Sequence, residues 1–505
     1  MNISSAKQTI KNTVMLYLKK DEYGSYEIPV ERQRPVFLLG APGIGKTAIM
    51  QQIAEEMEIA LVSYSMTHHT RQSALGLPFI TRKNYGGQEY SVSEYTMSEI
   101  IASVYETMEE SGMSEGILFL DEINCVSETL YPAMLEFLQY KVFGRHSVPQ
   151  GWVIVTAGNP PEYNRMVREF DVVTMDRMKL VEVDPDLKAW QQYAASRHLH
   201  PAILSYMELH QDHFYVMELS SKGRNYVTAR GWEDLSGILT MYEAENLPAD
   251  EELIGQYLHN EKVVREFAAY YELYNKYKRD YRISEILKSG AGKEEIKRAQ
   301  NARFDERISL LSMLSDRIEN DMEKILSQAD VLSKSLPVLR ALKEKAAGGA
   351  GIDEINDDLQ KAIDTGSKRQ KKLAAGGALS DAQRREFIRQ NSFLKEIAHA
   401  MKASDAENAA KVFEAAQDHY TKTLDLLRED TKSVSAELKN LLDFANEAFG
   451  EENEMLILLT RLTASKSASR FIATFGSDEY KKLCAGMMVS ERSLKLKEEI
   501  MKLDI

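Results

Sequence analysis

Short apolar runs alternate with longer amphipathic segments between residues 35 and 185, and this alternation predicts a parallel α/β sheet. The runs are rich in β-branched and aliphatic residues, and polar or turn residues follow each of them. They cover 35–39, 59–62, 117–120, 152–156 and 180–183. Between the first two runs Ile49, Met50, Ile53 and Met57 recur at helical spacing, which predicts a crossover helix.

The pattern changes after Pro185, where we expect the strands to stop and helices to form over 201–207 and 232–238. Beyond about residue 260 the chain is rich in Lys, Glu, Ala and Leu. One apolar stripe from Phe304 to Leu332 predicts a long helix that ends near Pro337. Glycine-rich breaks at 348–351 and 376–377 predict connections between helices.

These patterns predict three regions: an α/β core with a helix-flanked parallel sheet over 1–184, a small helical domain over 185–255, and an all-α helical bundle or coiled coil over 256–505. A chain of 505 residues with 44% hydrophobic residues agrees with several folded domains.

Charge and cysteine content narrow the class of protein. The formal net charge of −14 disfavours a protein that wraps nucleic acid or lies on an anionic membrane. Two cysteines, Cys125 and Cys484, are too few for a disulfide framework and agree with a reducing compartment. The first residues are too polar for a secretion signal, and no run of about 18 apolar residues occurs. We therefore expect a cytoplasmic protein without a membrane segment.

The first candidate for chemistry is a phosphate-binding loop that follows the predicted strand 35–39 and opens the next helix. Its nucleotide-binding residues are expected to be Gly40, Ala41, Pro42, Gly43, Ile44, Gly45, Lys46, Thr47 and Ala48. Backbone N–H groups and the helix N-terminus would face the phosphates. Lys46 would reach the β- and γ-phosphates, and the Thr47 hydroxyl would ligate Mg²⁺.

Acidic and amide side chains follow two later predicted strands, and together with the phosphate-binding loop they predict a hydrolytic site. Asp121 and Glu122 follow the apolar run 117–120. We expect Asp121 to join Thr47 in holding Mg²⁺, and Glu122 to polarise the attacking water. Asn159 follows the run 152–156, where its amide could contact both the γ-phosphate and that water.

Taken in chain order, the loop 40–47, Asp121-Glu122, the turn 158–160, Asp176-Arg177 and the segment 228–230 resemble the AAA+ ATPases, specifically the MoxR-like group within the dynein-related clade. The resemblance covers roughly the first half of the chain. Predicted hairpins around 78–92 and 142–150 resemble the two inserts of that clade.

The resemblance implies a ring, usually a hexamer, with ATP held between neighbouring subunits. Arg177 would be the finger that reaches a neighbour's γ-phosphate, and Arg230 the lid residue that senses nucleotide, because guanidinium matches phosphate oxygens. The sequence departs from the family at Met178, where an aromatic residue is usual. Arg165 and Arg168 therefore remain alternative fingers.

Our first hypothesis is an ATP-driven, chaperone-like remodelling enzyme that acts on a client protein, whose partner by resemblance could carry a von Willebrand factor A domain. The helical second half would select the client. A second hypothesis is a nucleotide-gated scaffold with little turnover. A third, a nucleic-acid motor, is disfavoured by the negative charge.

Two weaker features are expected to be structural. His198, His200, His210 and His213 crowd into one stretch, but no Cys or carboxylate completes a metal-ligand set at the usual spacing, so surface and packing roles suffice. Cys125 lies close to Glu122, but no partner pattern marks it as a nucleophile, and we expect a small buried residue.

Overall fold

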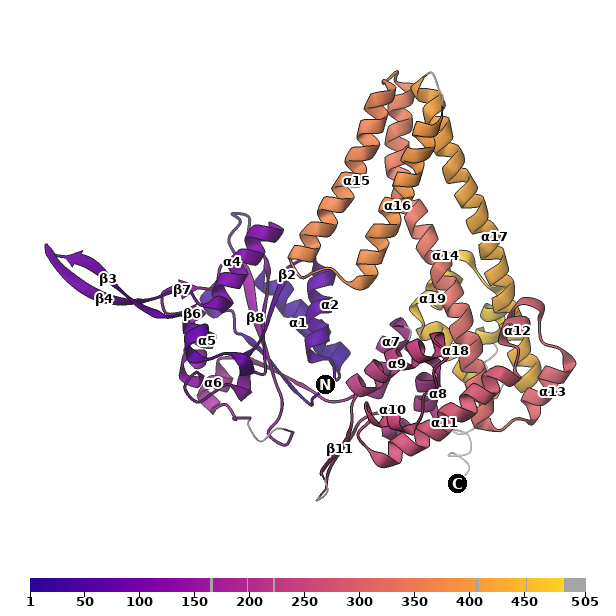
Figure 1. Ribbon diagram of the computed structural model, residues 1–505, viewed down its shortest axis with the longest axis horizontal. Helices are drawn as coiled ribbons and strands as arrows, with labels where there is room; N and C mark the ends of the chain where they lie inside the picture. Colours follow the sequence, from indigo (N-terminus) through magenta and orange to yellow (C-terminus); the bar gives the residue numbers. More distant parts are fainter. Residues whose placement is uncertain (164–166, 198, 221–222, 405–407, 451, 486–505) are drawn as a thin grey trace, which may run out of the picture. The chain divides into compact units, whose positions relative to one another are not determined.

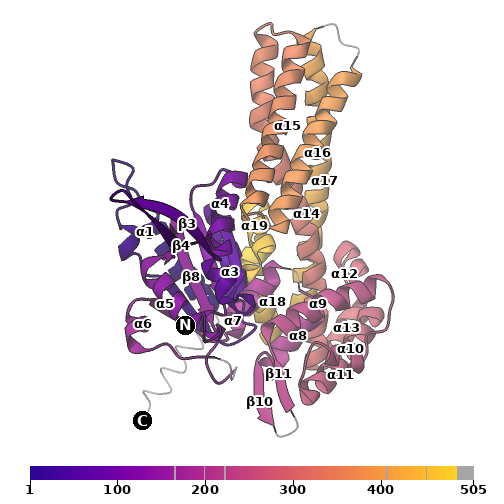
Figure 2. The same cartoon turned by 60° about the vertical axis from the view of Figure 1, so that its left-hand side comes forward.

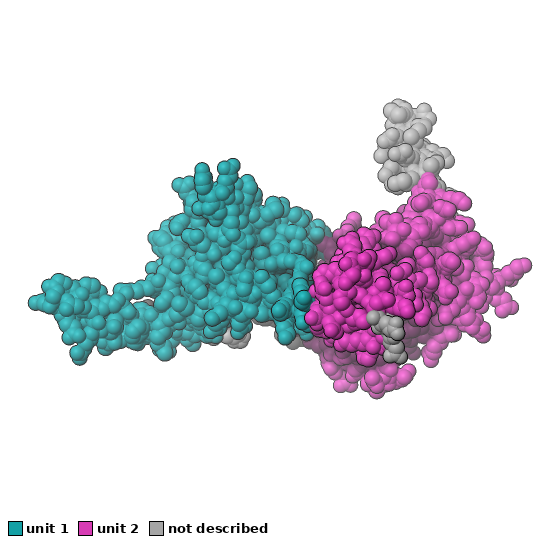
Figure 3. Space-filling view, turned by 90° about the horizontal axis from the view of Figure 1, so that it is seen from above, with its two compact units in different colours: residues 1–186, 361–391 teal, residues 187–360, 392–505 magenta. Residues whose placement is uncertain are grey.

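The computed structural model describes residues 1–163, 167–197, 199–220, 223–404, 408–450 and 452–485. The chain divides into two compact units, coloured separately in Figure 3. Unit 1 comprises 1–186 and 361–391, and unit 2 comprises 187–360 and the chain from 392 onward. The backbone therefore passes between the units three times, at 186/187, 360/361 and 391/392. These two compact units differ from the three consecutive regions that the sequence patterns predicted, 1–184, 185–255 and 256–505.

Unit 1 is built on a five-stranded parallel sheet in the order β2-β5-β8-β1-β9. The strands are β1 (Val36–Gly40), β2 (Ala60–Ser65), β5 (Gly116–Asp121), β8 (Trp152–Gly158) and β9 (Lys179–Val183). All five predicted strands are confirmed, and they share one sheet as expected. Because the strands are parallel, their carboxyl ends lie at one edge, where the loops after β1, β5 and β8 meet.

Helices cover both faces of this sheet, which explains why β8 is buried along its whole length. Helices α1 (Ile3–Tyr17) and α2 (Lys46–Met57) lie on one side, with α4 (Glu99–Ser111) and α5 (Tyr131–Tyr140) on the other (Figure 1). The predicted α/β sandwich is therefore confirmed.

Two hairpins interrupt the alternation of strands and helices, as predicted. The longer pairs β3 (Pro78–Tyr85) with β4 (Gln88–Tyr95), and the shorter pairs β6 (Val142–Phe143) with β7 (His146–Ser147). Short elements complete the described part of 1–186: η1 (Val30–Arg32), η2 (Met66–His68), α3 (Arg71–Leu75), η3 (Ile123–Cys125) and α6 (Val172–Asp176).

The connection between α15 (Ile352–Ala375) and α16 (Asp381–Ala403) belongs to unit 1, where it lies against strand β2. The backbone N–H of Leu61 donates to the carbonyl of Gly376 at 2.8 Å. Gly377 has φ +66°, and a Cβ there would lie 2.8 Å from the Leu61 carbonyl oxygen, so the close approach requires glycine. Because β2 is an edge strand, this segment, which we call the docked turn (361–391), covers backbone groups that would otherwise be unpaired.

Side chains of the docked turn also complete the hydrophobic core of unit 1. Leu373, Ala378 and Leu379 are buried in the same cluster as Ala60 and Leu118 of the sheet. At the rim, the Arg369 guanidinium pairs with the Glu58 carboxylate at 2.7 Å, across 311 residues of sequence. Both groups are more than half exposed, so the buried leucines contribute more to stability than this ion pair.

We expect Leu373→Ala to destabilise unit 1 by about 3 kcal/mol, because it removes a buried side chain and leaves a cavity beside the sheet. A two-unit chain need not unfold in one step, so the measurement is hydrogen–deuterium exchange of strands β2 and β5. Leu426→Ala, at a position that is 62% exposed on α17 (Ala409–Phe449), is the matched control. Unchanged exchange in β2 would contradict a core role for the docked turn.

Unit 2 begins as a compact set of helices around a core that includes Trp190, Tyr206, Trp232 and Phe267. Its first helices are α7 (Leu187–Ser196), α8 (Pro201–Leu209), α9 (Ala229–Ala244), α10 (Glu251–Gly255), α11 (Glu261–Asp280), α12 (Ile283–Ser289) and α13 (Lys293–Asn301). The helices expected over 201–207 and 232–238 are confirmed within α8 and α9. The expectation that strands stop after Pro185 is wrong, because β10 (Val216–Ser220) and β11 (Gly223–Val227) form an antiparallel hairpin.

The remaining described elements of unit 2 are also helices, in agreement with the predicted all-α region. They are α14 (Phe304–Ala347), α17 (Ala409–Phe449), α18 (Asn453–Ala464) and α19 (Lys466–Phe475), with parts of α15 and α16. Helices α14 and α17 pack against each other, and Figure 2 shows the helical region from a second side.

The prediction that the long helix ends near Pro337 is wrong, because α14 continues ten residues further to Ala347. A proline inside a helix removes one hydrogen bond and costs about 3 kcal/mol. Leu339 and Leu342, which follow the proline, are buried, and their burial offsets that cost. The predicted breaks at 348–351 and 376–377 are confirmed.

In the part of the chain that the structure describes, no helix is both long and apolar enough to cross a membrane.

Candidate nucleotide site

The loop between β1 and α2 has the backbone shape that its sequence predicted. Strand β1 ends at Gly40 and helix α2 begins at Lys46. Gly45 caps the helix with φ +94°, in the left-handed region that favours glycine. This places the N-terminus of α2, with its unpaired N–H groups and partial positive charge, at the carboxyl edge of the sheet.

Lys46, the first residue of α2, joins the loop to the end of β8. Its side chain is only 8% exposed, and Nζ donates to the carbonyls of Gly40 and Ala41 and to Oδ1 of Asn159, each at 2.8 Å. A buried ammonium needs this set of acceptors, because an unpaired charge would be costly. The predicted loop lysine and the predicted end of β8 are therefore in direct contact, which fits a site that holds phosphate oxygens at the same place.

Thr47 and Asp121 meet at the end of strand β5. The Thr47 hydroxyl donates to Oδ2 of Asp121 at 2.8 Å, and the other carboxylate oxygen accepts from the backbone N–H of Glu122 at 2.9 Å. A hydroxyl and a carboxylate in contact, with Thr47 exposed, are the oxygen donors that Mg²⁺ takes from a protein. The residues present therefore fit the predicted metal, with Thr47 and Asp121 as its ligands.

Glu122 is held in a fixed position by backbone and side-chain contacts. Its φ of +56° is unusual for a residue other than glycine, and such conformations concentrate at functional sites. Its Oε2 accepts hydrogen bonds from the hydroxyls of Ser65, at 3.0 Å, and Thr67, at 2.9 Å. Ser65 is the last residue of the neighbouring strand β2 and Thr67 follows it, so the sheet itself orients the carboxylate.

Asn124 is a site residue that the sequence patterns did not reveal. It is buried in η3, and its Nδ2 donates to the backbone carbonyl of Asn159 at 2.8 Å. Its own backbone carbonyl accepts from the N–H of Arg168 at 2.9 Å. Asn124 thus connects the loop after β5 with the loop after β8. Its spacing two residues after Glu122 was a usable signal, but an Asn in a turn is too common to stand out alone.

The three candidate finger arginines differ in their surroundings. Arg177 is exposed, and its Nη1 donates to Oε1 of Gln139 at 2.6 Å. Arg168 is half-buried, pairs with Glu128 and lies over the ring of Tyr131. Arg165 lies outside the described residues. Exposure favours Arg177 over Arg168 for contact with another subunit, although the finger assignment stays a prediction.

Two residues near Arg177 in the sequence, Asp171 and Met178, have structural roles. Asp171 caps α6 by accepting from the N–H of Thr174 at 2.7 Å, and its hydrogen bonds to Thr174 lower the pKa of its carboxyl. Met178, where an aromatic residue is usual, is only 4% exposed and packs into the core of unit 1. The methionine therefore fills the space under the arginine turn.

Arg230 belongs to unit 2, whereas the site residues described above belong to unit 1. It is the second residue of α9, a helix whose N-cap Thr228 accepts from the N–H of Gly231 at 3.2 Å, and its side chain is exposed. Its role as a nucleotide sensor stays a prediction.

Cys125 and His200 are both buried. Cys125 is buried as expected, and burial, followed by the charges of Glu122 and Asp121, raises the pKa of its thiol. The thiolate that a nucleophile needs is thereby disfavoured. His200 has a packing role: its Nδ1 accepts from the N–H of Ala202 at the start of α8, and its Nε2 lies 3.1 Å from Glu243. His198 lies outside the described residues.

Comparison with known proteins agrees with this geometry. Residues 36–173 match the profile of the ATPase family associated with various cellular activities (AAA). No curated protein gives a significant match to the chain. The matched segment contains the loop with Lys46 and Thr47, the pair Asp121 and Glu122, and Asn159. It supports an ATP-binding AAA+ ATPase, a family that typically uses Mg²⁺.

Proposed function

We propose that this protein is a MoxR-like AAA+ enzyme that hydrolyses ATP with Mg²⁺ between neighbouring subunits of a ring and uses the energy to remodel a client protein. The observation that carries the proposal is the meeting of three strand ends. Lys46 contacts Asn159 at 2.8 Å and Thr47 contacts Asp121 at 2.8 Å, so residues from the loops after β1, β5 and β8 form one site. The match over 36–173 supports the ATPase part alone.

Each residue has a defined role in the proposed hydrolysis. Lys46 and the N–H groups at the start of α2 hold the β- and γ-phosphates, and Asn159 contacts the γ-phosphate. Thr47 and Asp121 would hold Mg²⁺, which when bound neutralises charge on the phosphate oxygens. Glu122 accepts a proton from the attacking water, while Ser65 and Thr67 hold its carboxylate in place.

Exposed apolar side chains support contacts with other protein molecules. Next to Arg177, Val172 is 84% and Val173 59% exposed on α6, which suits a subunit interface. The hairpin of β3 and β4 exposes Phe79, Ile80, Tyr85 and Tyr90, which suits a client or a von Willebrand factor A-domain partner. The hexameric ring, the client and the cytoplasmic location are part of this proposal.

The direct test is steady-state ATP hydrolysis by the purified full chain, with ATP affinity measured in parallel. We expect Mg²⁺-dependent turnover on the order of 1 s⁻¹ or faster, within the range of ordinary enzymes. Tight ATP binding with negligible turnover, under conditions where the chain forms its oligomer, would favour the nucleotide-gated scaffold instead. Stimulation by DNA or RNA would favour the nucleic-acid motor.

Mixing two inactive variants tests whether sites are shared between subunits. We expect Arg177→Ala and Lys46→Ala chains, inactive alone, to recover activity when combined, because an intact loop can then face an intact arginine. With random mixing in a ring, about a quarter of the interfaces would be complete. The measurement is ATPase activity of the mixture relative to wild type.

The matched control combines Lys46→Ala chains with Arg168→Ala chains in place of Arg177→Ala chains. If Arg168→Ala, and not Arg177→Ala, is the variant that is inactive alone and recovers activity in the mixture, the finger is Arg168. If both variants assemble normally and no mixture recovers activity, the sites are not shared.

A further inference from the structure

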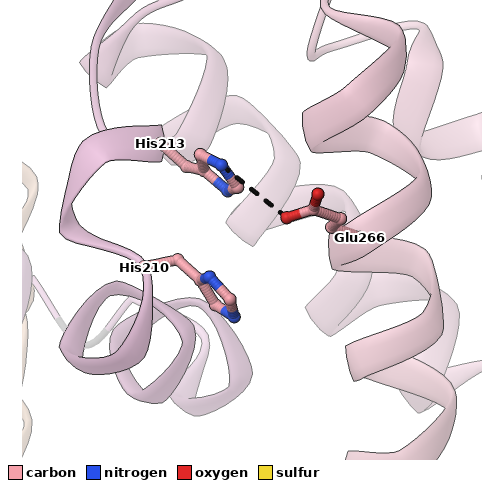
Figure 4. A group of neighbouring side chains, drawn as sticks. All are labelled: His210, His213 and Glu266. Atoms are coloured by element: carbon pink, nitrogen blue, oxygen red, sulfur yellow. Dashed lines mark ion pairs between the residues drawn. The ribbon is translucent and has the colours of Figure 1, made fainter.

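A cluster of three metal-ligating side chains in unit 2 has no part in the proposed hydrolysis. His210 is the C-cap of helix α8, His213 lies in η4 (Gln211–His213), and Glu266 projects from α11 (Figure 4). One potential ligand atom from each of them lies within 4.8 Å of the others. In the sequence no carboxylate stands at ligand spacing from these histidines, but the fold brings Glu266 to them from 53 residues beyond His213.

His213 is fixed with one ring nitrogen facing this cluster. Its side chain is buried, and Nδ1 lies 2.8 Å from the hydroxyl of Tyr206, which is itself fully buried. Trp232 holds the same turn, because its Nε1 donates to the carbonyls of His213, at 3.3 Å, and Phe214, at 3.2 Å. A metal-ligating histidine is typically oriented in this way, through a hydrogen bond at the nitrogen that does not bind the metal.

The distances from Nε2 of His213 to the neighbouring carboxylate oxygens fit ligands of one metal ion better than they fit hydrogen bonds. Nε2 of His213 lies 3.7 Å from Oε2 of Glu266 and 3.6 Å from Oδ2 of Asp212. Hydrogen bonds between such atoms are about 2.7–3.2 Å long. Ligand atoms on a tetrahedral zinc ion, with bonds of about 2.0–2.2 Å, lie roughly 3.4 Å apart. Small movements of these side chains would therefore suffice to seat an ion.

The rings of His210 and His213 are nearly parallel, with centroids 5.3 Å apart. His210 is half-buried at the C-cap of α8, where its ring also packs against Tyr206 with centroids 4.6 Å apart.

We propose that His210, His213 and Glu266 bind a divalent transition-metal ion, with zinc the best match, and that Asp212, whose carboxylate lies outside this group but 3.6 Å from Nε2 of His213, turns toward the ion as the fourth ligand. Imidazole and carboxylate ligands suit zinc. Two neutral imidazoles and two carboxylates carry a charge of about −2, which a divalent ion neutralises. The ion would join the turn after α8 to α11 and stabilise this part of unit 2.

Zinc binding to the tag-free full chain tests the proposal, measured by competition with a chromogenic chelator in excess Mg²⁺. We expect about one zinc ion per chain, bound at least about tenfold more weakly by His210→Asn and by Glu266→Gln. At the same zinc concentration, the melting temperature of the wild type should rise more than that of either variant. Both substitutions lie at half-buried positions, so the variants are expected to fold.

His399→Asn, at an exposed position on α16, is the matched control and should bind zinc as the wild type does. Lys46→Ala should also retain the zinc site, which separates this proposal from the proposed ATPase function. A wild-type chain that binds no zinc, or variants at His210 and Glu266 that bind it unchanged, would overturn the proposal.

Discussion

Replacing Lys46 with alanine is expected to lower kcat/KM for ATP by about 10³-fold or more, because the buried ammonium is the only lysine charge among the described residues of the loop. The substitution also leaves the carbonyls of Gly40 and Ala41 and the amide oxygen of Asn159 without their shared donor. ATP binding should weaken together with turnover. Steady-state kinetics and a direct nucleotide-binding measurement on the same preparation check both expectations.

Lys19→Ala is a suitable control for Lys46→Ala, since Lys19 is an exposed residue of the same unit. Hydrogen–deuterium exchange of β1 and β8 would establish that the Lys46→Ala chain remains folded. If the folded variant hydrolyses ATP within about tenfold of the wild type, the loop is not the hydrolytic site.

Glu122→Gln should separate binding from chemistry. We expect kcat to fall by about 10²–10⁴-fold, the usual contribution of a general base, because the amide cannot accept the proton of the attacking water. The amide oxygen can still accept from Ser65 and Thr67, so the local structure and the affinity for ATP should change little. Single-turnover hydrolysis and equilibrium binding are the two measurements.

Glu109→Gln, at an exposed position on α4, makes the same chemical change outside the site and should leave kcat unaltered. A Glu122→Gln chain that turns over ATP at the wild-type rate would remove Glu122 from the mechanism. A Glu122→Gln chain that loses ATP affinity instead would make it a binding residue.

The sheet and most of the nucleotide site were predictable, because local patterns encode both. Five short apolar runs each became a strand of one sheet, and the loop 40–47 and the pair Asp121-Glu122 lie at the strand ends where they were expected. Parallel strands buried on both faces are continuous apolar runs, and a phosphate loop needs glycines at fixed spacing. The apolar runs and the glycine spacing can both be recognised without knowledge of the tertiary structure.

What the sequence did not reveal depends on contacts between distant segments. Neither Asn124, which bonds across to Asn159, nor Glu266, which joins the two histidines, is distinguished by its neighbours in sequence. The local sequence of the docked turn predicts an ordinary connection between helices, although the Gly376 carbonyl accepts a hydrogen bond from the N–H of Leu61. The continuation of α14 past Pro337 likewise follows from burial of Leu339 and Leu342, which a local helix-breaking signal does not include.

The place of the docked turn in the chain has a consequence for biosynthesis. Residues 361–391 supply part of the core of unit 1, yet they are translated after the whole of 187–360. Domains usually fold in the order in which they leave the ribosome. Strand β2 and the apolar surface around Leu118 therefore stay exposed while about 170 further residues are translated. At ordinary rates of synthesis this translation takes roughly 10–30 s. Nascent chains of this protein should therefore depend on chaperones until Leu373 and Leu379 emerge.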